Sequence, residues 1–277
     1  MPLDLTIAQA VVLSDSSGPA VTATSDPFPD ALHAAVLDVA TRFGPRPPGV
    51  DVPAAVFVVP LLRAHIAVVQ MADRPGNALG FRFLVLTRRL YEAIGDPFLI
   101  ADRFPPDWSA RGPLHLLEWP PDPLPPRTVA EVAQVLKDGD GPFLLGATQG
   151  LLDGVRVVLV RPAPDEAVVR SLWKLLPTRS RGELWPATFA FNLDLGFHLA
   201  VLPAAPTPVP PGTVTEEQAK DYPQGRYELA LQIAAEDGSQ RDIDRLFARR
   251  TSRDTLRLAI LILIGAVLAA VASKLWQ

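Results

Sequence analysis

The chain contains no cysteine. This absence excludes disulfides, thiolate nucleophiles, iron–sulfur clusters and every zinc site that uses cysteine. The four histidines, His33, His65, His115 and His198, have no second histidine or carboxylate at metal-ligand spacing, so neither a metal nor a cofactor is expected. The sequence also lacks a Gly-Xaa-Ser-Xaa-Gly elbow, a phosphate-binding loop and a GxGxxG fingerprint. No recognised enzyme motif remains.

An excess of positive charge is also missing. The 26 basic and 30 acidic residues give a net charge of −4, and the two signs are interspersed along most of the chain. Nucleic-acid-binding domains instead concentrate lysine and arginine, so nucleic acid is not an expected partner. The first twenty residues carry no basic segment and no uninterrupted apolar run, and therefore do not indicate a secretory signal. We expect the N-terminal domain to be cytoplasmic.

One long apolar run lies at the C-terminal end, over residues 258–273, and it contains no charge. As a helix, this run is about 24 Å long, against about 30 Å for the hydrocarbon core of a bilayer. Extending it over residues 255–276 gives about 33 Å. A buried core helix is the alternative, but such a helix ordinarily has a polar stripe. We therefore predict a single transmembrane tail anchor, with the lipid bilayer as a partner.

Charge around this run predicts its orientation. Arginines precede it and a single lysine follows it, so the N-terminal side is expected in the cytoplasm of a single-pass cell-membrane protein. Charged and aromatic side chains at the ends of a span reach the membrane interface. The residues expected there are Arg253, Arg257, Lys274 and Trp276.

The thirty prolines divide the chain. A proline-rich linker is predicted at 203–214, between a cytosolic α+β domain at 1–202 and a charged helical stalk at 215–254. Thr215 and Gln218 have the spacing of a capping box at the start of that stalk. Within the domain, alternating or continuous apolar runs predict strands and stripes at helical spacing predict helices. The strands are expected near 5–13, 54–62, 65–71, 80–86, 155–160, 188–191 and 198–202, with helices ending at Gly44, Gly95, Lys137 and Pro177.

Several predicted strands follow one another without an intervening helix, which favours α+β (mixed α/β) architecture over a simple βαβ repeat. Residues 96–126 are rich in proline, aspartate and tryptophan and are expected to form a long irregular loop. Asp153-Gly154 is read as a hairpin-type turn that leads into the strand at 155–160.

Two groups of residues are candidates for function. Asp194 and His198 are the most plausible acid–base pair, although a histidine in an apolar strand is usually structural. The partner-binding candidates have equally simple alternatives as a tight turn, a solvated surface or packed aromatic rings. They are Asp73, Arg74, Asn77, Trp108, Trp119, Arg179 and Arg181.

Several segments carry a resemblance to a known family. The runs 144–154, 172–177 and 185–191, together with Arg181 and the turn from Asp73 to Asn77, resemble parts of bacterial GTPase-associated proteins, over about residues 65–202. The resemblance implies a partner role beside small GTPases in conflict or signalling systems. It supplies no catalytic residue.

The sequence thus favours an adaptor or regulatory protein that is tethered to a membrane and binds a cytosolic protein, and an enzyme is the less favoured alternative. That alternative has an acid–base site near Asp194 and His198. It requires these two side chains to meet another carboxylate, such as Asp73, Asp102 or Glu118, in one pocket.

Overall fold

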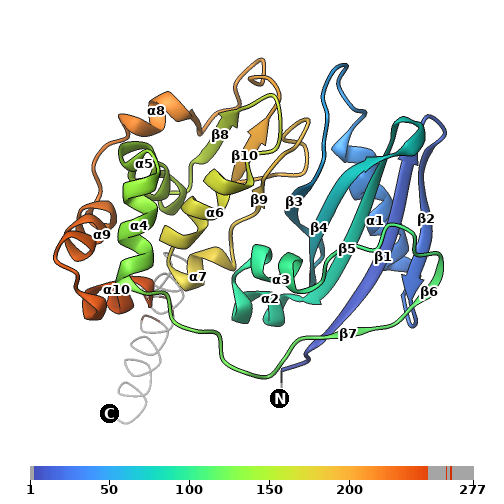
Figure 1. Ribbon diagram of the computed structural model, residues 1–277, viewed down its shortest axis with the longest axis horizontal. Coiled ribbons are helices and arrows are strands. Elements are labelled where there is room, and N and C mark those ends of the chain that lie inside the picture. Colours follow the sequence, from blue (N-terminus) through green and yellow to red (C-terminus); the bar gives the residue numbers. More distant parts are fainter. Residues whose placement is uncertain (1–2, 249–259, 261–262, 264–277) are drawn as a thin grey trace, which may run out of the picture.

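The computed structural model describes residues 3–248, 260 and 263, and there eleven strands form one mixed sheet (Figure 1). The order across the sheet is β11-β8-β10-β9-β3-β4-β5-β1-β2-β6, with β7 paired to β1. The strands are β1 (Thr6–Asp15), β2 (Gly18–Ser25), β3 (Ala55–Leu62), β4 (His65–Arg74), β5 (Ala78–Thr87), β6 (Gly112–Leu114), β7 (Leu117–Glu118), β8 (Arg156–Val160), β9 (Pro186–Ala187), β10 (Leu199–Leu202) and β11 (Thr213–Thr215).

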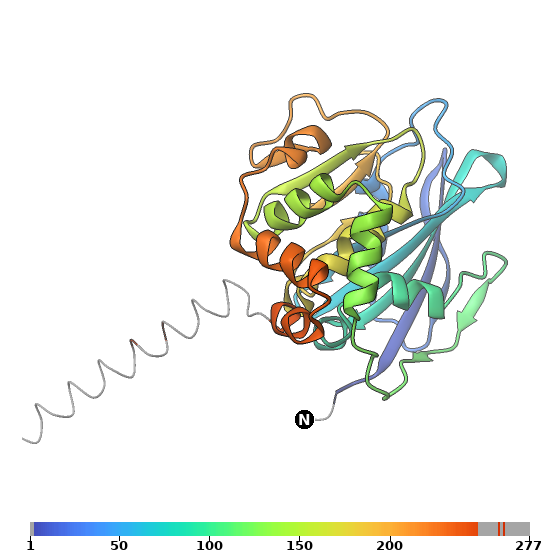
Figure 2. The same cartoon turned by 60° about the vertical axis from the view of Figure 1, so that its left-hand side comes forward.

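Helices cover both faces of this sheet (Figures 1 and 2). They are α1 (Asp30–Phe43), α2 (Arg88–Ile94), α3 (Pro97–Arg103), α4 (Val129–Asp138), α5 (Gly141–Leu152), α6 (Glu166–Leu175), α7 (Thr178–Arg181), α8 (Glu216–Lys220), α9 (Arg226–Glu236) and α10 (Gln240–Phe247), with a 3-10 turn η1 (Pro75–Asn77) between β4 and β5.

The antiparallel half of the sheet comprises β3, β4, β5, β1 and β2. Its central strands are buried on both faces, as expected of continuous apolar runs. On one face α1 inserts Phe43, which stacks on Phe57 with ring centroids 5.0 Å apart. On the other face Gln9, Gln70 and Arg82 form a buried polar network beneath residues 104–119. The predicted strands and α1 are therefore confirmed here, whereas β2 was not predicted.

The parallel half comprises β11, β8, β10 and β9. Parallel neighbours need a crossover, and α6, α7 and β9 lie in the connection from β8 to its parallel neighbour β10. The segment before Asp153 is the helix α5, so the predicted hairpin-type turn is instead a helix-to-strand turn. Asp140 begins α5 by accepting a hydrogen bond from the backbone N–H of Phe143 at 3.3 Å. Only β10 corresponds closely to the two strands predicted at 188–202.

The segment predicted as a stalk is described up to residue 248, and it lies against the domain. The capping box of Thr215 and Gln218 is present at the start of α8. Helix α8 crosses α5 at Gly146, α9 packs on α4 and α5, and α10 packs on α9. Tyr227 of α9 is buried and its hydroxyl donates a 2.6 Å hydrogen bond to the carbonyl of Leu175.

The structure corrects the predicted fold class, which joined an α+β domain to a stalk and a transmembrane helix. It shows a mixed α/β domain with one large mixed sheet. Among the described residues no helix is long and apolar enough to cross a membrane. The longest of them, α1, has 14 residues, which span about 21 Å against a core of about 30 Å.

The prediction of a tail-anchored, single-pass cell-membrane protein is therefore wrong on this finding. The segment assigned to the span, 255–276, lies outside the described residues except for Ile260 and Leu263. The predicted interface residues Arg253, Arg257, Lys274 and Trp276 also lie outside them.

Candidate functional site

The predicted acid–base pair is not assembled. The Nδ1 atom of His198 accepts a 3.0 Å hydrogen bond from the backbone N–H of Trp185, which leaves the proton of the neutral ring on Nε2. Burial and the nearby charge of Arg156 lower the pKa of His198, so the ring is neutral at pH 7. Asp194 is exposed and makes no hydrogen bond with His198; its backbone N–H donates to Asn192.

The polar side chains of the turn from Asp73 to Asn77 bond to other segments of the same domain. One carboxylate oxygen of Asp73 accepts from the N–H of Val52 at 2.7 Å and the other is paired with Arg46. Arg46 also donates to the side-chain oxygen of Asn77 at 3.1 Å, and Asn77 has the left-handed φ of 61° that asparagine tolerates. These contacts tie the loop before β3 to the β4–β5 connection.

The two candidate tryptophans pack on arginines. The guanidinium of Arg74 lies 5.5 Å from the ring centroid of Trp108, and that of Arg103 lies 5.7 Å from Trp119. Trp119 is only 5% exposed. Trp108 and Trp119 therefore pack the loop of residues 104–119 against the domain, and neither ring is free to anchor a protein partner.

Arg179 and Arg181 are the two sequence-predicted residues that the fold brings to a cavity. This cavity, which we name the basic pocket, has a volume of about 1090 Å³ and lies among α2, α3, α4, α6, α7, α10 and the loop 123–126. Its charged lining consists of Arg127, Arg170, Lys174, Arg179 and Arg181, with Asp96, Asp102, Glu131 and Asp244.

Arg181 is the buried member of the basic pocket. Its Nε donates to the carbonyl of Trp173 at 2.7 Å and its Nη1 lies 3.5 Å from the carboxylate of Asp96. Its Nη2 is buried and has no hydrogen-bond partner among the residues that the structure describes. Burial lowers the pKa of Arg181 although Asp96 and two tyrosines oppose that effect.

Arg127 lies beside Arg181. Its Nη1 donates to the carbonyls of Lys174 and Leu176 at 2.7 and 2.6 Å, and the ring of Phe247 covers its guanidinium at 3.5 Å. Burial and the like charge of Arg181 lower the pKa of Arg127 to about 9, so it remains a cation at neutral pH.

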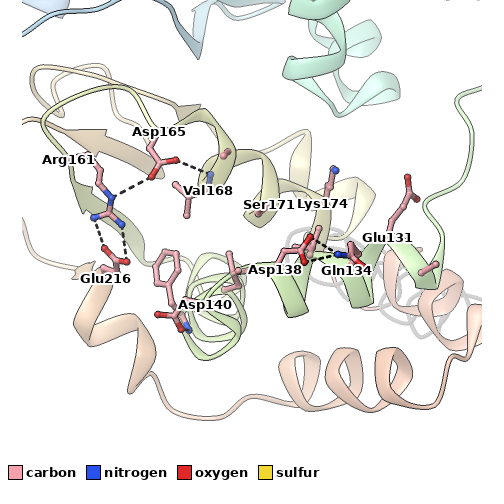
Figure 3. Close-up of a pocket in the computed structure, with 16 residues that line it drawn as sticks. Glu131, Gln134, Asp138, Asp140, Arg161, Asp165, Val168, Ser171, Lys174 and Glu216 are labelled. Atoms are coloured by element: carbon pink, nitrogen blue, oxygen red, sulfur yellow. Dashed lines mark hydrogen bonds and ion pairs between the residues drawn. The ribbon is translucent and has the colours of Figure 1, made fainter.

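A second cavity, which we name the acidic groove, lies between α4, α5, α6 and α8 and has a volume of about 820 Å³ (Figure 3). Its charged lining comprises five carboxylates and two cations. They are Glu131, Asp138, Asp140, Asp165 and Glu216, with Arg161 and Lys174. The larger apolar side chains that line it are Val135, Phe143, Leu144 and Val168.

Intramolecular bonds hold these carboxylates in place. Arg161 lies 3.4 Å from Asp165 and 2.8 Å from Glu216, and Figure 3 shows all three side chains together at one end of the groove. Asp138 accepts from the side-chain amide of Gln134 at 2.6 Å. Hydrogen bonding to Lys220 lowers the pKa of Asp140, which therefore stays ionised at neutral pH.

The two cavities share Glu131 of α4 and Lys174 of α6. Neither residue was singled out from the sequence, because each lies on the polar face of an amphipathic helix, where a solvated charge is the ordinary interpretation. Glu216 reaches the same groove from a segment far along the chain. Only the packing of α4, α6 and α8 brings these groups together.

The carboxylates that an enzyme site would require do not converge. Asp102 lines the basic pocket, where it forms a bidentate pair with Arg170 at 2.7 and 2.9 Å. Asp73, Glu118, Asp194 and His198 line neither cavity. In the described part of the chain, no group of three or more histidines and carboxylates is placed to hold a metal ion.

Comparison of the chain with protein-family models, with curated proteins and with solved structures gives no match.

Proposed function

We propose that this domain is a non-catalytic adaptor, and that the acidic groove binds a cationic amphipathic segment of a protein partner. The observation that carries the proposal is the charge of the groove. Five carboxylates against two cations leave its lining with a net charge of −3 around an apolar floor. Complementary charge of this kind favours encounter with a basic partner and selects against an acidic one.

The shape of the groove supports a helical ligand. Its larger apolar side chains come from three helices, Val135 from α4, Phe143 and Leu144 from α5, and Val168 from α6. An amphipathic helix places apolar side chains at positions i, i+3 and i+4 into such a groove and leaves its basic flanks beside the rim. Asp138 and Glu131 of α4 and Asp165 at the start of α6 supply carboxylates for such basic flanks.

The chemistry of the groove supports binding without catalysis. Ser171 is the hydroxyl that lines it, and the lining contains no histidine that would activate a serine as a nucleophile. The carboxylates already take part in helix caps, ion pairs and amide contacts. Because these bonds fix their positions before a ligand arrives, little side-chain entropy is lost on binding.

The resemblance of residues 65–202 to bacterial GTPase-associated proteins makes a small GTPase the first class of partner to test. A basic amphipathic helix on the surface of such a protein has the chemistry that the groove accepts.

The test uses charge reversal with a matched control. Asp138→Lys reverses a charge on the rim, whereas Glu236→Lys reverses one outside the groove. Both acids are exposed, stand in the last turn of a helix and accept from a glutamine four residues earlier. A lysine near a helix C-terminus is favoured by the helix dipole, so both variants are expected to fold.

The probe is a fluorescein-labelled helical peptide of lysine and leucine, and its binding to the full chain is followed by fluorescence anisotropy. We expect Asp138→Lys to weaken the Kd about tenfold. Glu236→Lys and wild type are expected to agree within about twofold. Equal affinity of the peptide for both variants, or tighter binding of an acidic peptide of the same length, would overturn the proposal.

A further inference from the structure

We propose that the basic pocket is a binding site for a small organic phosphate. This site is separate from the acidic groove and does not depend on the adaptor function. The pocket combines the buried guanidinium of Arg181, the half-buried guanidinium of Arg127, an ammonium at its edge that is unpaired among the described residues, and apolar walls, which together match a ligand with an apolar body and a phosphoryl group.

The charge of the pocket is not balanced at its floor. Arg127 and Arg181 lie side by side, and among the described residues Asp96 is the carboxylate that hydrogen-bonds to Arg181, whereas Arg127 donates only to neutral oxygens. Asp96 also accepts hydrogen bonds from the backbone N–H groups of Phe98 and Leu99, each at 3.1 Å, so its charge is already shared. Neighbouring like charges attract an anion, and the attraction is stronger at the buried Arg181 because its surroundings screen charge poorly.

The other carboxylates of the lining are engaged elsewhere. Asp102 is held by Arg170 in a bidentate pair, and Asp244 accepts from Gln240 at 2.8 Å. Glu131 accepts from the N–H of Thr128 at 2.7 Å as part of the capping box of α4. None of these three carboxylates forms a hydrogen bond or an ion pair with Arg127 or Arg181.

Two groups offer unused donors. Within the described part of the chain the buried Nη2 of Arg181 has no acceptor, and leaving a charged donor unpaired is costly. Arg181 lines the cavity, so an anion bound there is a candidate acceptor for this donor. At the edge, the ammonium of Lys174 makes no hydrogen bond or ion pair with the described residues. A phosphoryl group, with three acceptor oxygens and nearly two negative charges, satisfies both groups at once.

The apolar walls of the basic pocket indicate which groups the ligand carries besides its phosphoryl group. Phe98, Leu99, Leu124 and Phe247 provide apolar and aromatic surface around the floor. The cavity volume of about 1090 Å³ is in the range of pockets that enclose a small organic molecule, and exceeds what an inorganic ion fills. An aromatic phosphate ester is the simplest ligand that contacts both the apolar side chains and the guanidinium groups of Arg127 and Arg181.

The test titrates the full chain by isothermal calorimetry with phenyl phosphate, benzoate, phenol and inorganic phosphate. Phenyl phosphate is expected to bind most tightly, because it alone combines a ring with a phosphoryl group. Benzoate as tight as phenyl phosphate would overturn the phosphate assignment, and no heat with any probe at millimolar concentration would overturn the site.

Two variants and one control locate the binding. Lys174→Gln and Arg181→Lys are each expected to weaken phenyl phosphate binding about tenfold. The first variant removes a charged donor, and the second keeps the charge but loses the planar, forked set of guanidinium donors. Lys137→Gln, which removes an exposed ammonium outside both cavities, is expected to leave the Kd unchanged. Unchanged binding in Lys174→Gln would overturn the proposal even if Arg181→Lys fails to fold.

The same Lys174→Gln variant separates this site from the adaptor proposal. Losing a cation that lines both cavities weakens an anion in the basic pocket and strengthens a cationic peptide in the acidic groove. Opposite changes in the two Kd values support two distinct sites. A parallel change in both would contradict the assignment of the phosphate to the basic pocket.

Discussion

Replacing Arg82 with methionine is expected to destabilise the domain and to release the loop of residues 104–119 from the sheet. Arg82 stands on β5 and is 7% exposed. Its guanidinium donates to the side-chain oxygens of Gln9 and Gln70 and to the carbonyls of Phe104 and Pro105. It therefore connects three strands to the start of the loop.

The magnitude follows from the acceptors that lose their donor. Methionine leaves the oxygens of Gln9, Gln70 and Pro105 unpaired, whereas Phe104 keeps a 3.0 Å hydrogen bond from the amide of Gln70. At roughly 2 kcal/mol for each buried orphan, the loss is about 6 kcal/mol. Removing the buried cation recovers several kcal/mol of desolvation. Burial lowers the pKa of Arg82 to about 10, in keeping with such a cost. The expected net loss is about 3 kcal/mol.

The assay is urea unfolding followed by tryptophan fluorescence, combined with limited trypsin cleavage at Arg111, which lies exposed in the loop. Arg82→Met is expected to lower the midpoint and to speed cleavage at Arg111. Arg82→Lys, which keeps the charge with fewer donors, is expected to fall between Arg82→Met and wild type. Arg63→Met removes an exposed arginine in the turn between β3 and β4, away from this loop, and serves as the control. Stability of Arg82→Met within about 0.5 kcal/mol of wild type would refute the reasoning.

Two further predictions test the packing and the histidine. A Cβ on Gly146 would lie 1.9 Å from the backbone oxygen of Ala219, so Gly146→Ala is expected to cost about 3 kcal/mol in urea unfolding, while Gly141→Ala, with its nearest contact at 3.4 Å, is expected to be neutral or slightly stabilising. The native pKa of His198 lies below its ordinary 6.5. As the pH falls through 6.5 the unfolded chain binds this proton first, so stability decreases. Asn can accept the same bond from Trp185 without titrating, and His198→Asn is expected to lose less stability than wild type between pH 7 and pH 5; an identical loss in both would contradict this assignment.

Much of the local structure could be predicted because it depends on neighbours in sequence. Continuous apolar runs indicated β3 and β4, and the stripe that ends at Gly44 indicated α1. The capping box at Thr215 was visible from two residues three apart. By contrast, β2 and α3 lie in segments whose small, polar or proline-rich composition resembles that of loops, and their partners in the sheet stabilise them.

The candidate functional residues were also only partly predictable from the sequence. Arg179 and Arg181 stood out as a charged pair beside Trp185, but the sequence could not reveal that one is buried against Asp96 or that Arg127 lies next to it. Pairs such as Arg46 with Asp73 join positions 27 residues apart, and no periodicity encodes them. The turn from Asp73 to Asn77 therefore suggested a ligand, although its polar groups bind the chain itself.

By itself, the sequence determined the exclusion of cysteine chemistry, most of the strands and the amphipathic faces of α4 and α6, because these depend on residue type and short-range spacing. Only the tertiary structure decided which polar faces meet. It placed Glu216 beside Arg161, and Arg181 beside both Asp96 and Arg127, because charge convergence depends on the packing of helices that are distant in the chain.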